Sequence, residues 1–296
     1  MSETLPQQGP RAIIRAGAWM VGAMLGFSAM AVGVRELHDT MGSFEIVFWR
    51  GALGLPVLLF LAWRADWQPM RTRRLGFHIF RNLIHFVGQF SWVVAVAMLP
   101  LAEVFAIEFT VPIWILILAT IFLGEKLTSG KLIAVAAGFT GILLIVRPGF
   151  EEIHVGTWIM LIGAVGFGGA LTCTKSLTRT ESPLTILIMM SIIQLPLGLI
   201  PATFDWVNPT LEDVPYLAVI GSTGMFAHYC MARAFTLADA TIAMPIDFLR
   251  LPFIAVVGFF LYDEALELWV LLGALIIFAG NYYNLHKEHR AATAQT

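Results

Sequence analysis

The segment EFTVPIWILILATIFLGE occupies residues 108–125, and the segment DFLRLPFIAVVGFFLYDE occupies residues 247–264. Both begin with a carboxylate followed by phenylalanine, carry a proline soon afterwards and end in glutamate. The two opening residues, Glu108 and Asp247, are 139 residues apart. The same step relates Glu125 to Glu264, Trp19 to Trp158, Ala95 to Ala234 and Gly141 to Gly280. The chain is therefore predicted to contain two copies of one structural unit.

The composition predicts an integral membrane protein. Hydrophobic residues make up 58% of the 296 residues and charged residues only 13%, whereas soluble domains carry about 25% charged residues. The mean hydropathy is +0.80. The two cysteines, Cys173 and Cys230, both lie in apolar runs, so no disulfide framework is expected.

Ten apolar segments are close to the ~20 residues that cross a bilayer core as a helix. They span residues 16–34, 44–63, 79–98, 102–123, 131–147, 156–174, 184–204, 215–235, 241–262 and 267–285. We expect an all-α fold with two five-helix repeats, 16–147 and 156–285, between tails at 1–15 and 286–296. Because five is odd, the second repeat must enter the membrane from the opposite side. An inverted repeat with a polar centre is typical of secondary transporters.

The placement of lysine and arginine predicts the orientation. With the N-terminus in the cytoplasm, twelve of these residues flank the spans on the inner side and only Arg35 and Arg147 on the outer side. The inner set is Arg11, Arg15, Arg64, Arg71, Arg73, Arg74, Lys126, Lys131, Lys175, Arg179, Lys287 and Arg290. Such a bias favours the cytoplasm for both termini. We therefore expect a multi-pass protein of the bacterial inner (plasma) membrane, with the first apolar run retained as a helix.

Two carboxylates inside the spans are the leading candidates for binding a cationic group or a coupling proton. A charge at the bilayer centre costs about 2.5–3.5 kcal/mol on insertion scales, so Glu108 and Asp247 are expected to face a cavity or a partner. Pro112 and Pro252 follow them and remove backbone donors, which frees carbonyls in the same region. A structural alternative remains open for Asp247, because Arg250 lies three residues away on the same helix face.

Further polar and aromatic residues are candidates for the same pocket. Arg250 is expected either to neutralise Asp247 or to hold a substrate carboxylate. Arg50 lies inside the second span, where it either pairs with a carboxylate or reaches the outer headgroups. The remaining candidates for the lining of the pocket are Gln89, Trp92, Trp114, His228 and Tyr229. The aromatic members have an alternative role in packing against lipid or core, because the chain contains 22 Phe and 9 Trp.

The motifs resemble those of the EamA family in the drug/metabolite transporter superfamily. The resemblance rests on Pro112-Ile113-Trp114, on Gly124-Glu125-Lys126-Leu127, on the glycine-rich run 137–144 and on the second copy from Arg250 to Gly280. It covers about residues 15–285. It implies ten helices, cytoplasmic termini, a central cavity and alternating access without ATP. The stretch Asp-Phe-Leu-Arg-Leu-Pro at 247–252 is similar to bacterial uptake members for metabolites such as S-adenosylmethionine or riboflavin.

The sequence therefore predicts a secondary active transporter for a small polar or zwitterionic organic metabolite that is amino-acid-like, S-adenosylmethionine-like or vitamin-like. Coupling to protons or exchange is expected, in a monomer or a homodimer. No metal, other cofactor or nucleic-acid partner is expected. Two alternatives remain open, namely an intramembrane enzyme using Glu108 and Asp247 and a channel or scaffold protein. Against an enzyme, the chain lacks the His-Glu-x-x-His and Gly-x-Ser-x-Gly motifs.

Overall fold

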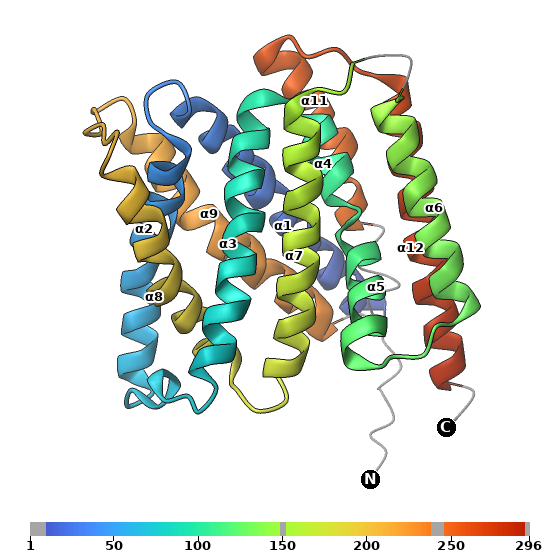
Figure 1. Ribbon diagram of the computed structural model, residues 1–296, viewed down its shortest axis with the longest axis horizontal. Helices are drawn as coiled ribbons and strands as arrows, with labels where there is room; N and C mark the ends of the chain where they lie inside the picture. Colours follow the sequence, from blue (N-terminus) through green and yellow to red (C-terminus); the bar gives the residue numbers. More distant parts are fainter. Residues whose placement is uncertain (1–9, 149–151, 238–245, 294–296) are drawn as a thin grey trace.

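A computed structural model describes residues 10–148, 152–237 and 246–293, and it shows α-helices with one short 3-10 helix and no β-strand in these ranges (Figure 1). The first half contains α1 (Pro10–Leu37), α2 (Ser43–Arg64), η1 (Gln68–Met70), α3 (Leu75–Met98), α4 (Leu101–Glu108), α5 (Val111–Leu123) and α6 (Ser129–Val146). The second half contains α7 (Val155–Leu177), α8 (Pro183–Ala202), α9 (Val214–Leu237), α11 (Arg250–Tyr262) and α12 (Leu268–Thr293).

Several elements of the two halves start and end in the same register. The bounds of α5 and α11, and those of α3 and α9, differ by the step of 139 residues. Both α5 and α11 end in a left-handed residue, Gly124 with φ 67° and Asp263 with φ 52°. Glycine adopts this conformation without a Cβ clash, and aspartate is among the few other residues that tolerate it. The repeated sequence thus produces repeated helix boundaries.

The expected span 102–123 is divided into two helices. The chain leaves α4 after Glu108, and α5 begins at Val111 with Pro112 in its first turn, where the missing N–H of proline is tolerated. The second half has a break at the equivalent place, since residues 246–248 are helical and α11 begins at Arg250 after Leu249. Each break lies directly beside one of the two predicted carboxylates.

By length and composition, eight helices of the described chain can cross a membrane. These eight are Ile14–Leu37, Ser43–Arg64, Leu75–Met98, Leu101–Leu123, Ser129–Val146, Val155–Leu177, Pro183–Ala202 and Leu268–Lys287. The predicted spans 215–235 and 241–262 are not among them. The first corresponds to α9 and the end of the second to α11, while residues 241–245 lie outside the described ranges. The architecture is a multi-pass helical bundle built from two repeats.

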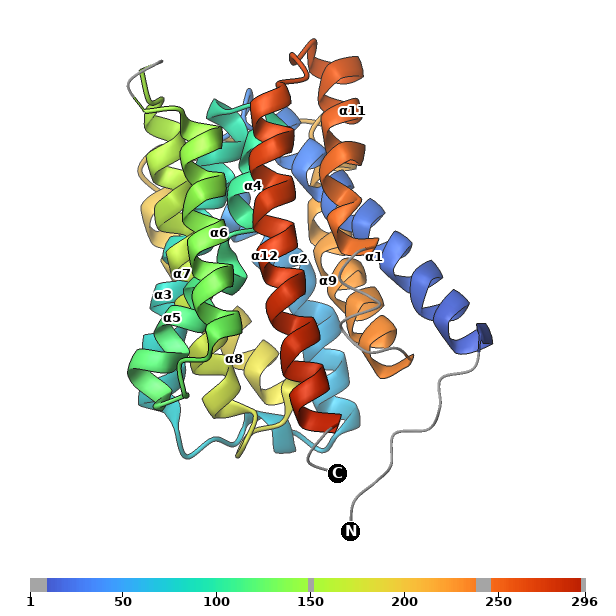
Figure 2. The same cartoon turned by 90° about the vertical axis from the view of Figure 1, so that its right-hand side faces the viewer.

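Helices of different halves pack side by side through small residues. The main contacts join α1 to α9, α3 to α7, α6 to α12 and α2 to α8 (Figures 1 and 2). Gly141 of α6 and Gly273 of α12 lie so close that a Cβ on either would sit 2.5–2.6 Å from the other's carbonyl oxygen. Close backbone approach of this kind stabilises helix pairs in lipid, where no hydrophobic effect drives association.

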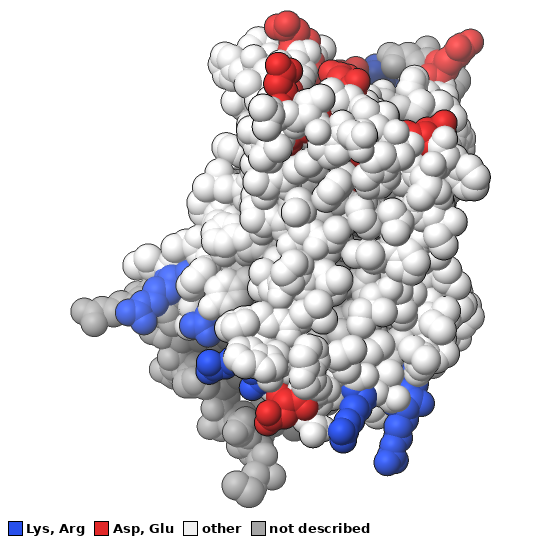
Figure 3. All heavy atoms as spheres, turned by 90° about the vertical axis from the view of Figure 1, so that its left-hand side faces the viewer, with Lys and Arg blue, Asp and Glu red and all other residues white. Residues whose placement is uncertain are grey.

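Charged side chains gather at the two ends of the bundle. On the face seen in Figure 3, aspartate and glutamate lie mainly at one end and lysine and arginine mainly at the other. We call these the acidic end and the basic end. α1 ends at the acidic end with Arg35 in its last turn, and α11 also ends there. A wide uncharged band separates the two ends, as expected for a protein surrounded by lipid.

Candidate functional site

Arg250 links the two repeats at the helix breaks. Its Nη1 lies 3.3 Å from Oε1 of Glu108, and its Nη2 lies 3.5 Å from Oδ2 of Asp247. The Arg250 side chain is 7% exposed and that of Asp247 10%. The carboxylates come from equivalent positions of the two halves, so one guanidinium neutralises both. We call Glu108, Asp247 and Arg250 the central triad.

Three aromatic rings surround the guanidinium of the central triad. The Cζ atom of Arg250 lies 4.9 Å from the ring centre of Phe27 and 5.1 Å from those of Phe105 and Phe109. Cation–π contacts of this kind stabilise a guanidinium that has lost its water. Nε of Arg250 and Oδ1 of Asp247 are nevertheless buried without a hydrogen-bond partner in the structure. These two atoms are available to a bound molecule or to water.

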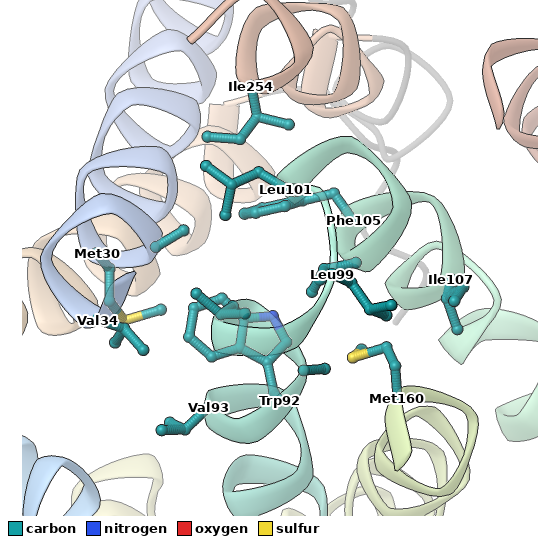
Figure 4. Close-up of a cluster of buried hydrophobic side chains, with 14 of the residues drawn as sticks. Met30, Val34, Trp92, Val93, Leu99, Leu101, Phe105, Ile107, Met160 and Ile254 are labelled. Carbon is teal, nitrogen blue, oxygen red and sulfur yellow. The ribbon is translucent and has the colours of Figure 1, made fainter. Parts of the chain in front are cut away.

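Glu108 is fixed by a second donor and keeps contact with the interior space. Nε1 of Trp92 donates a hydrogen bond of 2.8 Å to Oε2 of Glu108. The indole of Trp92 is buried, with Leu101, Phe105 and Val93 around it (Figure 4). The Glu108 side chain is 21% exposed, which is more than either partner in the central triad. Glu108 is therefore the most accessible carboxylate of the triad.

The helix break also frees a backbone acceptor. In a continuous helix the carbonyl of Phe109 would accept from the N–H of Ile113, but that N–H donates to Thr110 at 2.9 Å. Nδ2 of Asn281 on α12 donates to the Phe109 carbonyl instead, at 3.2 Å. A freed carbonyl inside a membrane needs such a partner. Asn281 thus holds the break in place from the other half.

A second group of basic residues lies beside the triad on α2, α3 and α9. The side chains of Arg50 and His85 are half-buried, and that of His228 is exposed. None of the three is therefore fully enclosed by protein. Nε of Arg50 lies 3.7 Å from the place of a Cβ on Gly224, one helical turn before His228 on α9. We call these three residues the basic cluster.

The basic cluster continues into a hydrogen-bonded network. Nε2 of Gln194 lies 2.9 Å from Nδ1 of His85 and 3.1 Å from Oδ1 of Asn82. The same Asn82 oxygen accepts a 2.7 Å hydrogen bond from Nη1 of Arg81, and Nε of Arg81 donates to Oγ1 of Thr174 at 3.1 Å. This network joins α3, α7 and α8. It fixes His85 and satisfies Arg81 with neutral acceptors.

The predicted residues are only partly brought together. Glu108, Asp247, Arg250 and Trp92 form one contact group, and Arg50 and His228 lie beside it in the basic cluster. Gln89 is buried on α3 at 4% exposure. Nε1 of Trp114 donates to Thr110 at 3.2 Å while its ring packs edge-on against Phe139. Tyr229 packs edge-on against Trp19 at 5.7 Å and is 57% exposed, so neither ring touches the triad.

The sequence did not predict the ion pair between Glu108 and Arg250 or the packing of phenylalanine rings around Arg250. The pairing of Glu108 with Arg250 crosses between the halves, and the sequence shows no basic residue near Glu108. Phe27 and Phe105 carried no signal beyond being two of many phenylalanines. The described residues contain no group of three or more His, Cys, Asp or Glu side chains that is suited to a metal ion.

Two equivalent glutamates close the helix ends in different ways. At the acidic end, Oε1 of Glu264 lies 3.1 Å from Nη2 of Arg35, and its Oε2 accepts from the N–H of Leu101 at 2.8 Å. At the basic end, Glu125 pairs with Lys131 at 2.9 Å and with Lys175. The Glu264 side chain is 11% exposed and that of Glu125 28%. The carboxylate at the acidic end is thus the more buried of the two, although Lys131 is itself more buried than Arg35.

An apolar groove of about 400 Å³ lies between α1, α9 and α11. We call it the α1–α11 groove. It is lined by Leu25, Ser28, Ala29, Val32, Gly33, Tyr216, Val219, Phe253 and Val257. α1 and α11 contact each other beyond it at the acidic end, where the hydroxyl of Tyr262 donates to Oε1 of Glu36 at 2.8 Å. Arg250 and Phe27 make the corresponding contact nearer the triad.

Comparison with known proteins identifies relatives along nearly the whole chain. The model of the EamA-like transporter family matches residues 15–147 and again residues 154–285. An S-adenosylmethionine uptake transporter of Rickettsia bellii is 27% identical over 273 residues, which is 92% of this chain and 94% of that protein. A riboflavin transporter of Rhizobium johnstonii is 29% identical over 295 residues, 98% of this chain and 97% of that one.

More distant similarity extends to an exporter and to a solved structure. The pseudopaline exporter CntI of Pseudomonas aeruginosa is 24% identical over 261 residues, covering 86% of this chain and 90% of that protein. A protein crystal structure aligns with a TM-score of 0.62 at 15% identity, covering 90% of this chain and 95% of that chain. The latter similarity supports the fold alone.

Proposed function

The chain belongs to the EamA-like transporter family, and from this premise we propose that it moves a small polar or zwitterionic organic metabolite by alternating access around the central triad. That it is a transporter of a small metabolite, and not an enzyme, follows from the family and its relatives. The observation that carries the proposal is the bridge from Arg250 to Glu108 and Asp247. It places the intramembrane charges where the repeats meet, which is where inverted-repeat transporters bind their substrates.

The relatives favour a substrate with a charged or polar ring system. Two of them are transporters for S-adenosylmethionine and riboflavin, and one exports pseudopaline. We therefore propose an amino-acid-like, S-adenosylmethionine-like or vitamin-like substrate for this chain. The partly exposed ring of Phe27 suits a planar or cationic part of such a molecule.

We further propose that Glu108 exchanges its arginine contact for a proton or for a cationic group of the substrate. Its exposed fraction and its two donors, Arg250 and Trp92, support this role. Protonation of Glu108 would remove one of the two charges that hold Arg250. Proton coupling or substrate exchange then follows from competition for the same carboxylate. We expect the basic end to face the cytoplasm of a bacterial inner membrane, in a monomer or a homodimer.

The test is ligand-dependent thermal stabilisation of the purified protein in detergent. A ligand that binds only the folded state raises the melting temperature by mass action. We expect one class among amino acids, S-adenosyl compounds, nucleosides and vitamins to stabilise the wild type. Glu108→Gln and Asp247→Asn are expected to abolish that stabilisation. Exposed Glu212→Gln is the matched control and is expected to leave it unchanged.

The proposal fails if the stabilising compound acts equally on wild type, Glu108→Gln and Asp247→Asn. It also fails if the compound stabilises the wild type but shows no counterflow in proteoliposomes. A channel would give flux without saturation or counterflow.

A further inference from the structure

We propose that the substrate carries an anionic group, and that this group binds between Arg50 and His228 of the basic cluster instead of at Arg250. The inference rests on the proposed transport of a small metabolite and adds its charge and the position of its charged group. Neither the family nor the relatives assign a role to these two residues.

The first argument is the charge count in the middle of the bundle. The described helices place Arg50 and Arg250 there, and Arg81 between this region and the basic end, against the carboxylates Glu108 and Asp247. Arg250 already engages both carboxylates. Trp92 occupies the second oxygen of Glu108. The interior therefore carries an excess of positive charge.

The second argument is the state of Arg50. No carboxylate of the described residues forms an ion pair with it, and Glu108 is already engaged by Arg250. An intramembrane guanidinium without a counter-ion is costly and marks a binding or transport pathway. Arg81 differs, because Asn82 and Thr174 accept its hydrogen bonds. Arg50 thus differs from Arg81 in that neither an ion pair nor a hydrogen bond to another described residue satisfies its guanidinium.

The third argument is the position of the cluster. Nε of Arg50 lies 3.7 Å from the place of a Cβ on Gly224, so the guanidinium lies along α9. His228 follows one helical turn later on α9, and its side chain is exposed. Its ring packs edge-on against Phe27 at 5.0 Å, and Phe27 also lies under Arg250. The two sites are therefore neighbours on either side of one phenylalanine.

This arrangement fits a molecule with two unlike parts. A carboxylate or phosphate can accept from the Arg50 guanidinium, which forms short, charge-assisted hydrogen bonds with such groups. His228 can donate from one ring nitrogen to the same anion. The remaining part of the molecule then reaches the rings and the Glu108 carboxylate. A compound that lacks the anion leaves Arg50 without a counter-ion.

Matched pairs of compounds test the inference. They are riboflavin 5′-phosphate and riboflavin, and adenosine monophosphate and adenosine. Affinities come from titrations of the melting temperature with purified full-length protein. Within the class that binds, we expect the anionic member to bind at least about tenfold more tightly, which corresponds to about 1.4 kcal/mol.

Variants locate the preference. Arg50→Gln and His228→Gln are each expected to bring the affinity ratio between the anionic and the neutral compound towards one. Arg50→Lys is expected to keep part of this preference. Arg64→Gln, at the exposed end of the same helix α2, is the matched control and keeps the full ratio. The neutral member is expected to bind the wild type, Arg50→Gln and His228→Gln with similar affinity, which shows that these proteins are folded.

Three results overturn the inference. The first is that the wild type binds the anionic and the neutral member of a pair equally tightly. This result leaves the proposed function intact. A preference for the anion that survives in both Arg50→Gln and His228→Gln moves the site elsewhere. If no compound of any pair stabilises the wild type, the proposed function fails for these classes and the inference fails with it.

Discussion

α5 and α11 occupy the same register in the two repeats, but α5 packs along α7 whereas α11 meets α1 at only a few positions. At the α5–α7 contact, a Cβ on Gly168 would lie 2.6 Å from Cβ of Trp114. The equivalent residues of the other pair are Ala29 and Phe253, and both line the α1–α11 groove. Figure 2 shows α1 leaning away from α12 towards its N-terminal end.

Equivalent segments of the two repeats therefore pack differently within one molecule, closely at α5 and α7 and loosely at α11 and α1. The acidic end is closed by the buried contacts of Glu264 with Arg35 and Leu101. At the basic end, the equivalent Glu125 holds one buried lysine, Lys131, and one exposed lysine, Lys175. Alternating access in inverted-repeat transporters is largely a rocking or gating movement of one repeat against the other. If this chain works in that way, the two arrangements are expected to interchange. We therefore expect the α1–α11 groove to close when the acidic end opens.

The largest effect is expected from Glu264→Gln compared with Glu125→Gln. Glu264→Gln leaves Arg35 without its ion-pair partner at a largely buried site, and breaking such a pair costs about 3–5 kcal/mol. Because Arg35 also donates to the carbonyl of Leu99, we expect the lower end of that range. Glu125→Gln removes a more exposed carboxylate that is shared between the buried Lys131 and the exposed Lys175. We expect a smaller loss than for Glu264→Gln, because the contact with Lys175 is an exposed pair, for which about 0–1 kcal/mol is typical. Free energies of unfolding in detergent, from denaturant titration of both variants, measure the difference.

Equal losses for these two substitutions would contradict the comparison. A Glu264→Ala variant distinguishes loss of charge from loss of the hydrogen bond to Leu101, because glutamine keeps an acceptor oxygen and alanine does not. We expect Glu264→Ala to be the less stable of the two.

The next largest effect is expected from adding bulk to the two equivalent helix contacts. Gly168→Leu inserts a side chain where Trp114 leaves no room, and overpacking costs about 1–3 kcal/mol or more. Ala29→Leu places the same side chain in a groove of about 400 Å³, so the free energy of unfolding should change by less than about 1 kcal/mol. Thermal melting of both variants measures the contrast. A loss for Ala29→Leu as large as that for Gly168→Leu would show that the groove is not available space.

Ala29→Phe sharpens the same comparison with transport as the measurement. If the groove must close during transport, a ring in it should slow the cycle while ligand binding is kept. We expect a fall of about tenfold in exchange rate, equivalent to about 1.4 kcal/mol on the barrier. Ala218→Phe, on the exposed face of α9, is the matched control. Undiminished exchange with Ala29→Phe would mean that the groove keeps its shape throughout the cycle.

The sequence predicted the repeat and most helix boundaries because both depend on local patterns. Apolar length, proline and helix-ending residues are properties of neighbouring positions, and they placed the breaks beside Glu108 and Asp247. The pairing of Glu108 with Arg250 was not predictable, since it depends on how two distant helices meet. The unlike states of the two halves were also not predictable, because α5 and α11 have equivalent boundaries and similar composition. Trp114 and Tyr229 carried the same signal as Trp92, but only Trp92 faces the triad.

The smallest expected effect concerns acid stability at the basic end. Hydrogen bonds from Lys175 and then from Lys131 lower the pKa of Glu125 below its ordinary value. A carboxylate whose pKa is lower in the folded state adds stability above its unfolded pKa of about 4.3, and this is lost as the pH falls through the folded pKa. Because the side chain is 28% exposed, solvent screening limits the contribution to less than about 1 kcal/mol. Melting curves from pH 7 to 3 should therefore show a slightly smaller acid loss for Glu125→Gln than for the wild type, whereas an identical loss would mean that the lysine contacts do not persist in solution.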